Sequence, residues 1–378
     1  MVSERMASIQ ESTTLKISAE AKRLAAEGLD VIDMGVGEPD FDTPRHIIES
    51  AYRSMLDGET HYAPTNGIPD LRKAIAKKLR TENNLPVTPD DVAVTPGAKM
   101  AVFAAIQAMM DQGDECVLIG PSWVSYEPCI TFAGGQVSWA SVDQRFQPLD
   151  LAEAITSRTR LIVVNSPGNP TGAVFGRRML QEIRDLAIDH DLLVISDEIY
   201  EKIIYGEEHI SIGSLPDMAD RTVTINGFSK SYAMTGWRLG YLAGPKEIMK
   251  YVSRLLSHSV SSATTFVQRA GVAALEGPQE EADRMVKEFR IRRDLLVSGL
   301  QSLGIPCAMP GGAFYVFPDV SALGGGDSFA QRLLKEGLMA ATPGSAFGPG
   351  GADYVRLSYA TSQERLTEAL RRIGRMVG

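Results

Sequence analysis

A mainly parallel β-sheet covered by helices, followed by a smaller α+β unit, is the fold that the sequence predicts. Short apolar runs alternate with helical patterns through the centre of the chain, which is typical of α/β proteins. Two of these runs, Leu161–Val164 and Leu192–Ile195, are apolar without alternation, as expected of strands that are buried on both faces. After about residue 285 the pattern changes to an arginine-rich helix around Phe289–Leu303 and two strand-like runs, Ala313–Phe317 and Tyr354–Tyr359.

The strands and helices of the central region can be placed along the chain. The expected strands are Val92–Thr95, Cys116–Gly120, Leu161–Asn165, Leu192–Ser196, Thr222–Asn226 and Tyr241–Gly244. Helices are expected where apolar side chains recur at every third or fourth position, as over Ile68–Leu79, Ala101–Met110 and Met179–Ala187. Another helix is expected to start at Thr43 and Pro44 and to end at Gly58. Its expected inner face consists of Ile47, Ile48, Ala51 and Met55.

The composition is that of a globular protein with room for more than one domain. The chain has 378 residues, of which 44% are hydrophobic and 22% are charged. Its formal net charge of −9 disfavours non-specific binding to nucleic acid, which needs clustered Lys and Arg. A local basic pocket for a small anion is still compatible with this charge.

The sequence indicates no metal site, disulfide frame or membrane segment. Its three cysteines, Cys116, Cys129 and Cys307, lie far apart without CxxC or Cys/His spacing, as expected of reduced thiols. Residues 1–10 are polar, unlike a signal peptide, and no apolar stretch approaches the ~20 residues of a membrane-spanning helix. We therefore expect a cytoplasmic protein without a membrane or nucleic-acid partner.

Polar side chains of different chemistry follow three neighbouring strands. The strands that begin near residues 161, 192 and 222 are followed by Asn169, by Asp197 and Tyr200, and by Lys230. Because the carboxyl ends of parallel strands meet at one edge of a sheet, these side chains are expected to converge there. Each has an ordinary alternative, since Asn169 can be a turn residue, Asp197 a helix cap and Lys230 a solvated lysine. Together on one rim, with Arg238 eight positions after Lys230, they favour a functional site.

This set of side chains is the one that a pyridoxal phosphate (PLP) enzyme needs. The amine forms an imine with the cofactor, and a carboxylate keeps the pyridine nitrogen protonated because a nearby negative charge favours the cation. An Asn and a Tyr can hydrogen-bond the phenolate oxygen of the cofactor, and an Arg suits its phosphate.

Three further candidates complete the hypothesis. Gly97, Ala98 and Lys99 lie between a strand and a helix, where backbone N–H groups can bind phosphate, although an ordinary turn is the alternative. Trp123 can cover the face of the cofactor ring or be a structural tryptophan. Arg356 lies in a predicted strand, where it can clamp a carboxylate or be an edge-strand charge in water.

Several motifs resemble those of the fold-type-I PLP-dependent aminotransferases of class I/II, and of these the bacterial and archaeal aspartate aminotransferase branch is the most similar. The matching runs are Gly35–Asp42, His61–Pro64, Gly67–Arg72, Asn165–Gly172, Ser196–Tyr200, Asn226–Lys230, Met234–Arg238 and Val355–Ala360. They cover essentially the whole chain and occur in the right order. The resemblance implies a large domain with a mainly parallel, seven-stranded-type sheet carrying helices on both faces, and a smaller α+β domain.

The resemblance also implies a role for each candidate residue. Lys230 would be the catalytic lysine that forms the imine, Asp197 would bind the pyridine nitrogen, and Arg238 would bind the phosphate. PLP would be held by Gly97, Ala98, Lys99, Trp123, Asn169, Asp197, Tyr200, Lys230 and Arg238, with Tyr62 reaching the phosphate in the neighbouring subunit. The substrate would contact Thr14, Gly37, Lys99, Trp123, Asn169 and Arg356, the last together with the backbone of Gly37 at the α-carboxylate.

The family fold further implies a division of the chain and an assembly. Residues 1–12 would form an N-terminal arm, residues 46–285 a large PLP-binding domain, and residues 13–45 with 286–378 a small domain. Because Tyr62 would serve the neighbouring subunit, a homodimer with shared active sites is implied.

The reaction implied by the resemblance is a ping-pong transfer of an amino group from an L-amino acid, most simply L-aspartate, to 2-oxoglutarate. Animal-type aspartate aminotransferases bind the distal carboxylate with an arginine in the loop after the cofactor lysine, and Leu255–Gln268 contains no arginine here. In this branch a lysine at the position of Lys99, near the polar segment 12–14, takes over, so a dicarboxylic donor is expected. Prephenate, aromatic amino acids and alanine stay open as substrates.

Other functions are compatible with parts of the pattern. A PLP-dependent carbon–sulfur lyase would share every cofactor residue, and release of ammonia or thiol without an oxo-acid acceptor would reveal it. A non-catalytic PLP-binding regulator would carry a DNA-binding domain, and no basic helix-turn-helix segment precedes residue 30. A nucleotide-dependent enzyme is disfavoured, because Gly35-Val36-Gly37 lacks the third glycine of GxGxxG and the sequence has no GxxxxGK loop.

Overall fold

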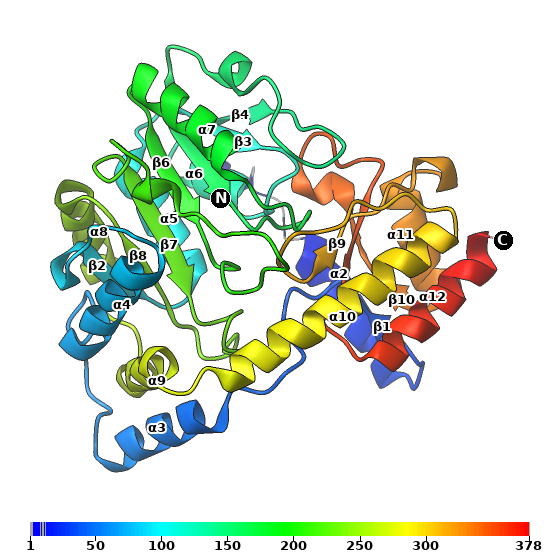
Figure 1. The fold of residues 1–378 in the computed structure, drawn as a ribbon, viewed down its shortest axis with the longest axis horizontal. Helices are drawn as coiled ribbons and strands as arrows, with labels where there is room; N and C mark the ends of the chain where they lie inside the picture. Colours follow the sequence, from blue (N-terminus) through cyan, green and yellow to red (C-terminus); the bar gives the residue numbers. More distant parts are fainter. Residues whose placement is uncertain (1–2, 8, 10, 12, 378) are drawn as a thin grey trace.

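A computed structural model gives the structure of residues 3–7, 9, 11 and 13–377 (Figure 1). Residues 1–2, 8, 10 and 12 of the expected N-terminal arm lie outside these described residues. The described part of the arm contains a short helix, α1 (Glu4–Ala7). The first long helix is α2 (Thr13–Ala26).

Within the described residues, the large sheet has seven strands in the order β2-β8-β7-β6-β5-β3-β4. Their bounds are β2 Val92–Thr95, β3 Glu115–Ile119, β4 Gln136–Ala140, β5 Thr159–Asn165, β6 Leu193–Asp197, β7 Thr222–Gly227 and β8 Gly240–Ala243. The strands from β4 to β7 pair in parallel, whereas β8 is antiparallel to both β7 and β2. The predicted mainly parallel sheet is therefore confirmed, with β4 as a strand that the sequence pattern did not predict.

Helices cover both faces of this sheet, because adjacent residues of a buried strand point to opposite sides. In β3, Cys116 and Leu118 pack toward the side of α5, α6 and α8, whereas Val117 packs on the opposite side with α7. On that second side, α4 and α9 cover the end of the sheet formed by β2 and β8. The bounds of these helices are α4 Pro69–Glu82, α5 Ala98–Met109, α6 Tyr126–Phe132, α7 Arg177–Asp189, α8 Lys246–Ser259 and α9 Thr265–Glu276.

The helix α3, Arg45–Leu56, begins without the predicted cap. Thr43 is engaged elsewhere: its hydroxyl donates to the carbonyl of Ala233 at 2.7 Å and accepts from Trp237 Nε1 at 2.9 Å. Pro44 therefore occupies the N-cap position, and the threonine joins the helix to the loop after β7 instead.

The inner face of α3 also differs from its prediction. Its buried residues are Ile47, Ala51 and Ser54, at a spacing of four and three, and the two apolar ones pack with α9. Ile48 and Met55 lie one position further round the helix and are 44% and 41% exposed. The prediction was wrong at these two positions, because two adjacent apolar stripes compete in the sequence and only one faces α9.

The C-terminal part builds small sheets together with residues from near the N-terminus. Among the described residues, β11 (Thr342–Pro343), β12 (Val355–Ser358) and β9 (Tyr315–Val316) form one sheet, in which β12 is central. A second pair joins β1 (Ile32–Asp33) to β10 (Met339–Ala340) in parallel. The strand expected over Ala313–Phe317 is shorter, because Ala313 has a φ of 58° and its backbone leaves the extended conformation. The helices of this part are α10 Glu280–Ser302, α11 Gly326–Gly337 and α12 Gln363–Val377.

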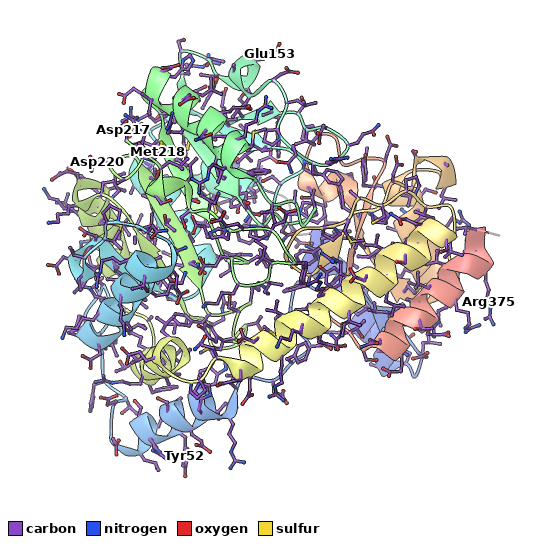
Figure 2. The ribbon with its side chains drawn as sticks, in the orientation of Figure 1. Tyr52, Glu153, Asp217, Met218, Asp220 and Arg375 are labelled. Carbon is purple, nitrogen blue, oxygen red and sulfur yellow. The ribbon has the colours of Figure 1, made fainter. Side chains whose placement is uncertain are left out.

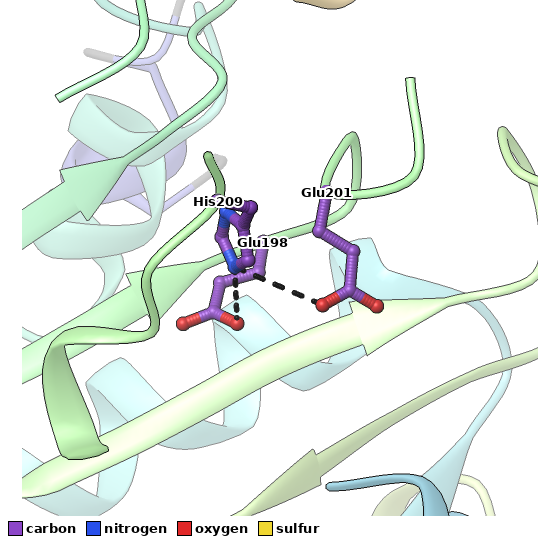
Figure 3. Close-up of side chains that lie close together, drawn as sticks. All are labelled: Glu198, Glu201 and His209. Atoms are coloured by element: carbon purple, nitrogen blue, oxygen red, sulfur yellow. Dashed lines mark hydrogen bonds and ion pairs between the residues drawn. The ribbon is translucent and has the colours of Figure 1, made fainter. Parts of the chain in front are cut away.

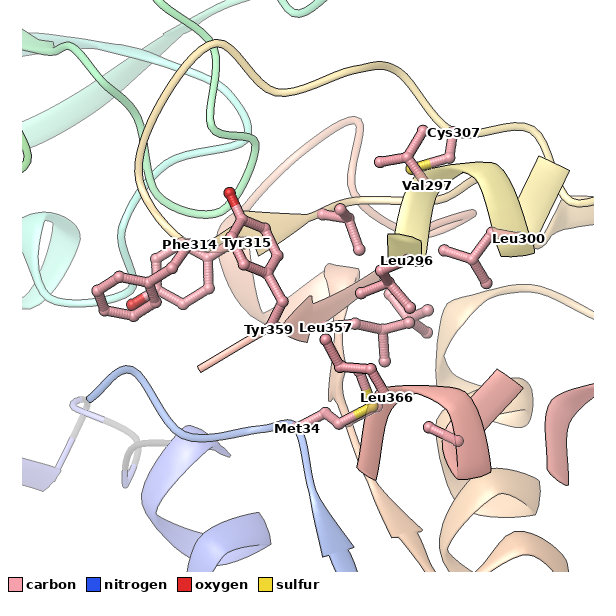
Figure 4. Close-up of a cluster of buried hydrophobic side chains, with 14 of the residues drawn as sticks. Met34, Leu296, Val297, Leu300, Cys307, Phe314, Tyr315, Leu357, Tyr359 and Leu366 are labelled. Carbon is pink, nitrogen blue, oxygen red and sulfur yellow. The ribbon is translucent and has the colours of Figure 1, made fainter. Parts of the chain in front are cut away.

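A hydrophobic cluster joins segments of this part that are far apart in the sequence (Figure 4). Met34, Leu296, Leu357 and Leu366 belong to it, and so does Tyr200 from the loop after β6. The long helix α10 runs from this cluster toward α9 (Figure 1). The expected domain boundary at residue 285 falls inside that helix, and the division into residues 46–285 against 13–45 with 286–378 stays a prediction.

None of the helices in the described part of the chain is both long and apolar enough to cross a lipid bilayer. Cys116, Cys129 and Cys307 are buried and carry free thiols. Burial raises the pKa of the Cys129 thiol to about 11, which holds it in the neutral form. The expected cytoplasmic location stays a prediction.

Candidate active site

A cavity of about 300 Å³ lies at the edge of the sheet where β5, β6 and β7 end. Most of the residues predicted for a site line it: Thr14, Gly37, Ala98, Lys99, Trp123, Asn169, Asp197, Tyr200, Lys230, Arg238 and Arg356. The expected convergence of the strand ends is therefore confirmed in position. Two predicted residues, Gly97 and Tyr62, do not belong to the lining.

The pairing of β5 with β6 places the polar residues at the ends of these two strands side by side. Asn165 and Asp197 are partners at the ends of β5 and β6, and the Asn165 amide donates to the Asp197 carbonyl at 3.0 Å. Asn165 Oδ1 accepts from the backbone N–H of Asn169 at 2.9 Å. Asn165 therefore fixes the turn that carries Asn169 against the end of β6.

The carboxylate of Asp197 is buried at the bottom of the cavity. Its Oδ2 accepts a hydrogen bond from the Tyr126 hydroxyl at 2.7 Å, and its Oδ1 accepts one from the backbone N–H of Ile199 at 3.3 Å. Burial raises the pKa of Asp197 to about 6, although both hydrogen bonds act in the opposite direction. Near neutral pH this group is an anion, and a cationic partner would favour that state further. Tyr126 is a site residue that the sequence analysis missed.

The amine of Lys230 faces the cavity from the turn after β7. Its Nζ donates to the carbonyl of Gly37 at 2.5 Å. Burial lowers the pKa of Lys230 to about 8, and the Glu38 carboxylate opposes this shift only in part. A considerable fraction of the amine is therefore neutral near pH 8, and a neutral amine is the form that acts as a nucleophile.

Arg356 is buried at 3% exposure in the central strand β12, so it is not an edge-strand charge in water. Its Nη1 donates to Asn169 Oδ1 at 2.9 Å, and its Nη2 donates to the Gly35 carbonyl at 2.6 Å. The guanidinium carbon lies 4.5 Å from the centroid of the Tyr315 ring. Its Nε has no hydrogen-bond partner among the described residues. A buried guanidinium with an unsatisfied N–H suits an anionic partner such as a carboxylate.

Two tyrosines stand beside this arginine. The hydroxyls of Tyr200 and Tyr315 lie 2.9 Å apart, and burial raises the pKa of both phenols, so both stay protonated near neutral pH. The Tyr315 hydroxyl also approaches Gly37, where a Cβ would lie only 2.7 Å from it. A side chain at position 37 would therefore displace the Tyr315 hydroxyl. The sequence analysis missed Tyr315, which looked like an ordinary residue of a buried strand.

The start of α5 and Arg238 form a close corner of the cavity. Gly97 occupies the N-cap position of α5 with a φ of 82°, and a Cβ there would lie 2.4 Å from Arg238 Nη2. A Cβ on Gly240 would lie 2.3 Å from the backbone nitrogen of Ala98. Both glycines allow the guanidinium and the helix N-terminus to come together, and this combination favours an anion. Gly97 shapes the corner although it does not line the cavity.

Next to this corner, the wall of the cavity combines a cation with an aromatic ring. Lys99 Nζ lies 5.2 Å from the centroid of the Trp123 ring, and Trp123 meets Tyr126 edge-on at 5.1 Å. Burial lowers the pKa of Lys99, and the nearby Arg238 acts in the same direction. Thr14 lines the cavity as well.

The cavity is cationic although the whole chain is acidic. Among the residues that line it, Lys99, Lys230, Arg238 and Arg356 are basic, and Asp197 is the carboxylic acid. This balance suits a ligand or a pair of ligands with several negative charges, which a phosphate and carboxylates would supply.

Tyr62 lies away from this cavity and is 93% exposed. On α3, Ile48, Tyr52, Met55 and Leu56 are also exposed, with Tyr52 at 57% and Leu56 at 68%. Figure 2 shows Tyr52 at the outer edge of the molecule. Grouped apolar side chains on one exposed helix face are typical of an interaction surface.

A family model and curated relatives both place the chain among the aminotransferases. The family model described as aminotransferase class I and II matches residues 29–373. An aspartate/prephenate aminotransferase of Thermus thermophilus is 44% identical, with 100% of this chain and 99% of that protein covered. An aspartate aminotransferase of Geobacillus stearothermophilus is 43% identical, with 100% and 98% covered.

Solved structures agree in the fold. The aspartate aminotransferase from Thermus thermophilus with maleate gives a TM-score of 0.95 at 43% identity, with 99% of each chain covered. An aromatic aminotransferase from Pyrococcus horikoshii gives a TM-score of 0.90 at 40% identity, with 95% of this chain and 98% of that chain covered.

Proposed function

The chain belongs to the class I and II aminotransferases, which depend on PLP, and we propose that it transfers the amino group of L-aspartate to 2-oxoglutarate. The observation that carries this proposal is the cationic cavity, in which the Lys230 amine lies among Asp197, Arg238, Arg356 and Lys99. The names of the relatives from Thermus and Geobacillus support aspartate as the donor.

The residues that line the cavity have the chemistry that PLP needs. The corner of Gly97, Ala98 and Arg238 would hold the phosphate, since a Cβ on Gly97 would fill the space beside the guanidinium. Asp197 would hold the pyridine nitrogen as its carboxylate partner, and Asn169 with Tyr200 would serve the phenolate oxygen. Bound there, PLP supplies an aldehyde that takes up amino groups and a protonated ring that withdraws electrons from the substrate α-carbon.

The chain's own residues divide the remaining work. Lys230 would hold the cofactor through its side-chain amine, and the Nζ of Lys230 would take up the proton of the substrate α-carbon. Asp197 keeps a negative charge next to the ring nitrogen, and the Tyr126 hydroxyl fixes the orientation of that carboxylate. Asn165 keeps Asn169 in register with Asp197.

The same residues would bind a dicarboxylic donor at its two ends. Arg356, whose Nε is unsatisfied among the described residues, would hold the α-carboxylate together with the backbone of Gly37. Lys99 with Thr14 would face the distal carboxylate. The solved relative from Thermus contains maleate, a dicarboxylate, which supports this division. Since one cavity serves the donor and the acceptor in turn, we propose a ping-pong sequence.

A panel of amino donors tests this function directly. We expect L-aspartate with 2-oxoglutarate to give the highest kcat/KM, measured as 2-oxo acid formation, and alanine and phenylalanine to be slower. Prephenate is a second candidate for the acceptor, since the Thermus relative is named for it, and belongs in the same panel. Release of ammonia or thiol without an acceptor would instead identify a lyase.

The role of Lys99 predicts a selective loss. In Lys99→Ala we expect kcat/KM for aspartate to fall by about 10²-fold, because a charge-assisted contact worth about 1.5–3 kcal/mol is removed. With alanine, which has no distal carboxylate, we expect less than about a threefold change. Equal losses with both donors would mean that Lys99 acts through the cofactor and not through the distal carboxylate. Lys250→Ala, on an exposed position of α8, is the matched control.

We further propose that the protein works as a homodimer in which Tyr62 reaches the phosphate site of the neighbouring subunit. The 93% exposure of Tyr62 supports a role outside its own subunit. The exposed apolar face of α3, formed by Ile48, Tyr52, Met55 and Leu56, would be covered in the same contact.

Charges on the face of α3 should separate the subunits. We expect Tyr52→Glu with Leu56→Glu to shift the protein from dimer to monomer in size-exclusion chromatography with light scattering, since two buried charges oppose association. Activity should fall with the dimer fraction. Ile291→Glu, at a 51% exposed position on α10, makes the same type of change and should leave a dimer. A wild type that is monomeric at assay concentration would refute the shared site.

A further inference from the structure

A second group of charged side chains lies directly behind the cavity wall and is not part of the cavity. Asp197 and Tyr200 line the cavity, whereas Glu198 and Glu201 of the same turn belong to a buried network on the other side. His209 lies between these two acids: its Nε2 is 3.0 Å from Glu198 Oε2 and 3.7 Å from Glu201 Oε2 (Figure 3). One turn therefore presents Asp197 and Tyr200 to the cavity and Glu198 and Glu201 to this network.

Side chains from the α4 region close the network. Lys78, at 5% exposure in the middle of a buried helix face, forms an ion pair with Glu201 and donates to Asn83 Oδ1 at 2.7 Å. The Asn83 amide donates to Glu201 Oε2 at 2.6 Å and to Glu198 Oε2 at 3.1 Å. Every carboxylate oxygen of the two acids has a donor once two serines are added: Ser196 donates to Glu198 Oε1 at 2.8 Å and Ser211 to Glu198 Oε2 at 2.7 Å.

The three groups Glu198, Glu201 and His209, two carboxylates and one imidazole, could hold a divalent cation if the space between them were open. Here the Asn83 amide and the Lys78 ammonium already donate to the Glu201 oxygens that would otherwise face a metal. The Lys78 side chain therefore supplies the positive charge that a metal ion would otherwise bring.

The charges of the network balance only when His209 is protonated. Glu198 and Glu201 bring two negative charges, while Lys78 brings one positive charge and His209 can bring the other. Glu82 and Lys202, which pair with each other at 3.1 Å at the more exposed rim, cancel in this sum. Burial lowers the pKa of His209, but the Glu198 and Glu201 carboxylates outweigh it and hold that pKa above its ordinary value. An unpaired charge at this depth would be strongly destabilising.

We propose that Lys78 and His209 are positioning residues of the active site: as counter-ions of Glu198 and Glu201, they fix the turn that presents Asp197 and Tyr200 to the cofactor. The inference rests on the proposed roles of those two cavity residues toward PLP. Neither Lys78 nor His209 lines the cavity, so both act through the turn. The backbone of the turn is held at its start by the Asn165 amide on the Asp197 carbonyl at 3.0 Å and by the Glu198 N–H to Ile225 carbonyl bond at 2.9 Å, and further on by the Glu201 N–H to Glu198 carbonyl bond at 2.9 Å. The buried ion pairs tie it to α4.

A double-mutant cycle on the Lys78–Glu201 pair tests the proposal. The two single variants, Lys78→Met and Glu201→Gln, each leave one charge of the pair buried without its partner, whereas the double variant restores a neutral network of similar shape. We expect each single variant to lower the Tm of the PLP-free protein by about 5 °C and to weaken PLP binding about tenfold, measured by equilibrium titration. The double variant should regain most of both losses. Additive losses, or a lowered Tm with unchanged PLP affinity, would overturn the positioning role.

A pH series on His209 gives a second, independent test with the PLP-free protein. Because the folded-state pKa of His209 is raised, its protonation stabilises the fold fully below the unfolded value of about 6.5, and this stabilisation is lost as the pH rises through the folded pKa. The Tm advantage of the wild type over His209→Gln should therefore be largest at pH 6 and shrink by pH 9. The exposed His190→Gln should show no such trend. An advantage that is independent of pH would overturn the charge balance.

The outcomes can be separated from those of the proposed function. If the wild type binds PLP and transfers amino groups while the cycle is additive, the inference fails and the function stands. If the wild type does not bind PLP, the function fails, and the Tm cycle still reports on the network itself. A Tm that falls after treatment with EDTA would mean that a metal, and not Lys78, balances the acids, and would also overturn the inference.

Discussion

Replacing Lys230 with alanine is expected to abolish turnover and the absorbance of the lysine-bound cofactor. Removal of a covalent nucleophile lowers kcat by on the order of 10⁶-fold in enzymes where it has been separated from binding. Here the same amine is proposed to bind the cofactor and to move the α-proton, so its removal takes away both functions at once. The neighbouring basic side chains, Arg238 and Arg356, cannot act as nucleophiles because guanidinium groups stay protonated. Steady-state kinetics and absorbance spectra at equal cofactor loading measure both effects.

A charge-preserving variant separates covalent chemistry from electrostatics. Lys230→Arg keeps a cation in the cavity and is expected to be as inactive as the alanine variant. PLP should still bind to it without a covalent link, because the corner of Gly97, Ala98 and Arg238 is untouched. Reduction with borohydride should then label the wild type at Lys230 and leave both variants unlabelled. Turnover within about tenfold of wild type in either variant would refute the assignment of Lys230.

The large sheet could be predicted from the sequence because its strands are buried on both faces. Leu161–Val164 and Leu192–Ile195 have no polar positions that a solvated strand would show, and both became central parallel strands. The edge strand β4, Gln136–Ala140, escaped because Gln136 is exposed and Ser138 interrupts the apolar pattern. The strands β1, β10 and β11 have two residues each, which is too short for a periodic pattern, and β1 pairs with β10 more than 300 positions away in the chain.

The gathering of polar side chains at one sheet edge could also be predicted, because the order of parallel strands brings their ends together. Asn169, Asp197 and Lys230 line one cavity as expected from this rule. Tyr126 and Tyr315 could not be found in the same way. Their side chains meet Asp197 and Tyr200 only after α6 and β9 have packed against the sheet, and in the sequence both look like core aromatics.

The network behind the site was invisible for a related reason. Lys78 follows two exposed lysines of the same helix, Lys73 and Lys77, and nothing in the local pattern marks it as buried. Its partner Glu201 is 123 positions away in the chain. Contacts of this kind depend on the docking of α4 against the turn after β6, which periodicity does not encode.

Asp197→Asn is expected to have the second largest effect on catalysis. The amide has the size of the carboxylate and can still accept the hydrogen bond from Tyr126, so the fold should persist. It cannot supply the negative charge that favours a protonated ring nitrogen. Loss of one partner of a buried charge pair is worth about 3–5 kcal/mol, which corresponds to a fall in kcat of about 10²–10⁴-fold.

The pH dependence of kcat at saturating cofactor distinguishes this cause from a loss of cofactor binding. In the wild type without ligand the pKa of Asp197 is about 6, and a cationic ring beside the carboxylate should lower it. Activity should therefore persist below pH 6 and fail only where the carboxylate is protonated. In Asp197→Asn that acidic limb should disappear, while kcat stays low at every pH. The exposed Asp185→Asn on α7 should keep the wild-type profile, because its charge is screened by water. An Asp197→Asn variant with wild-type kcat at pH 7 would show that the ring nitrogen does not need this carboxylate.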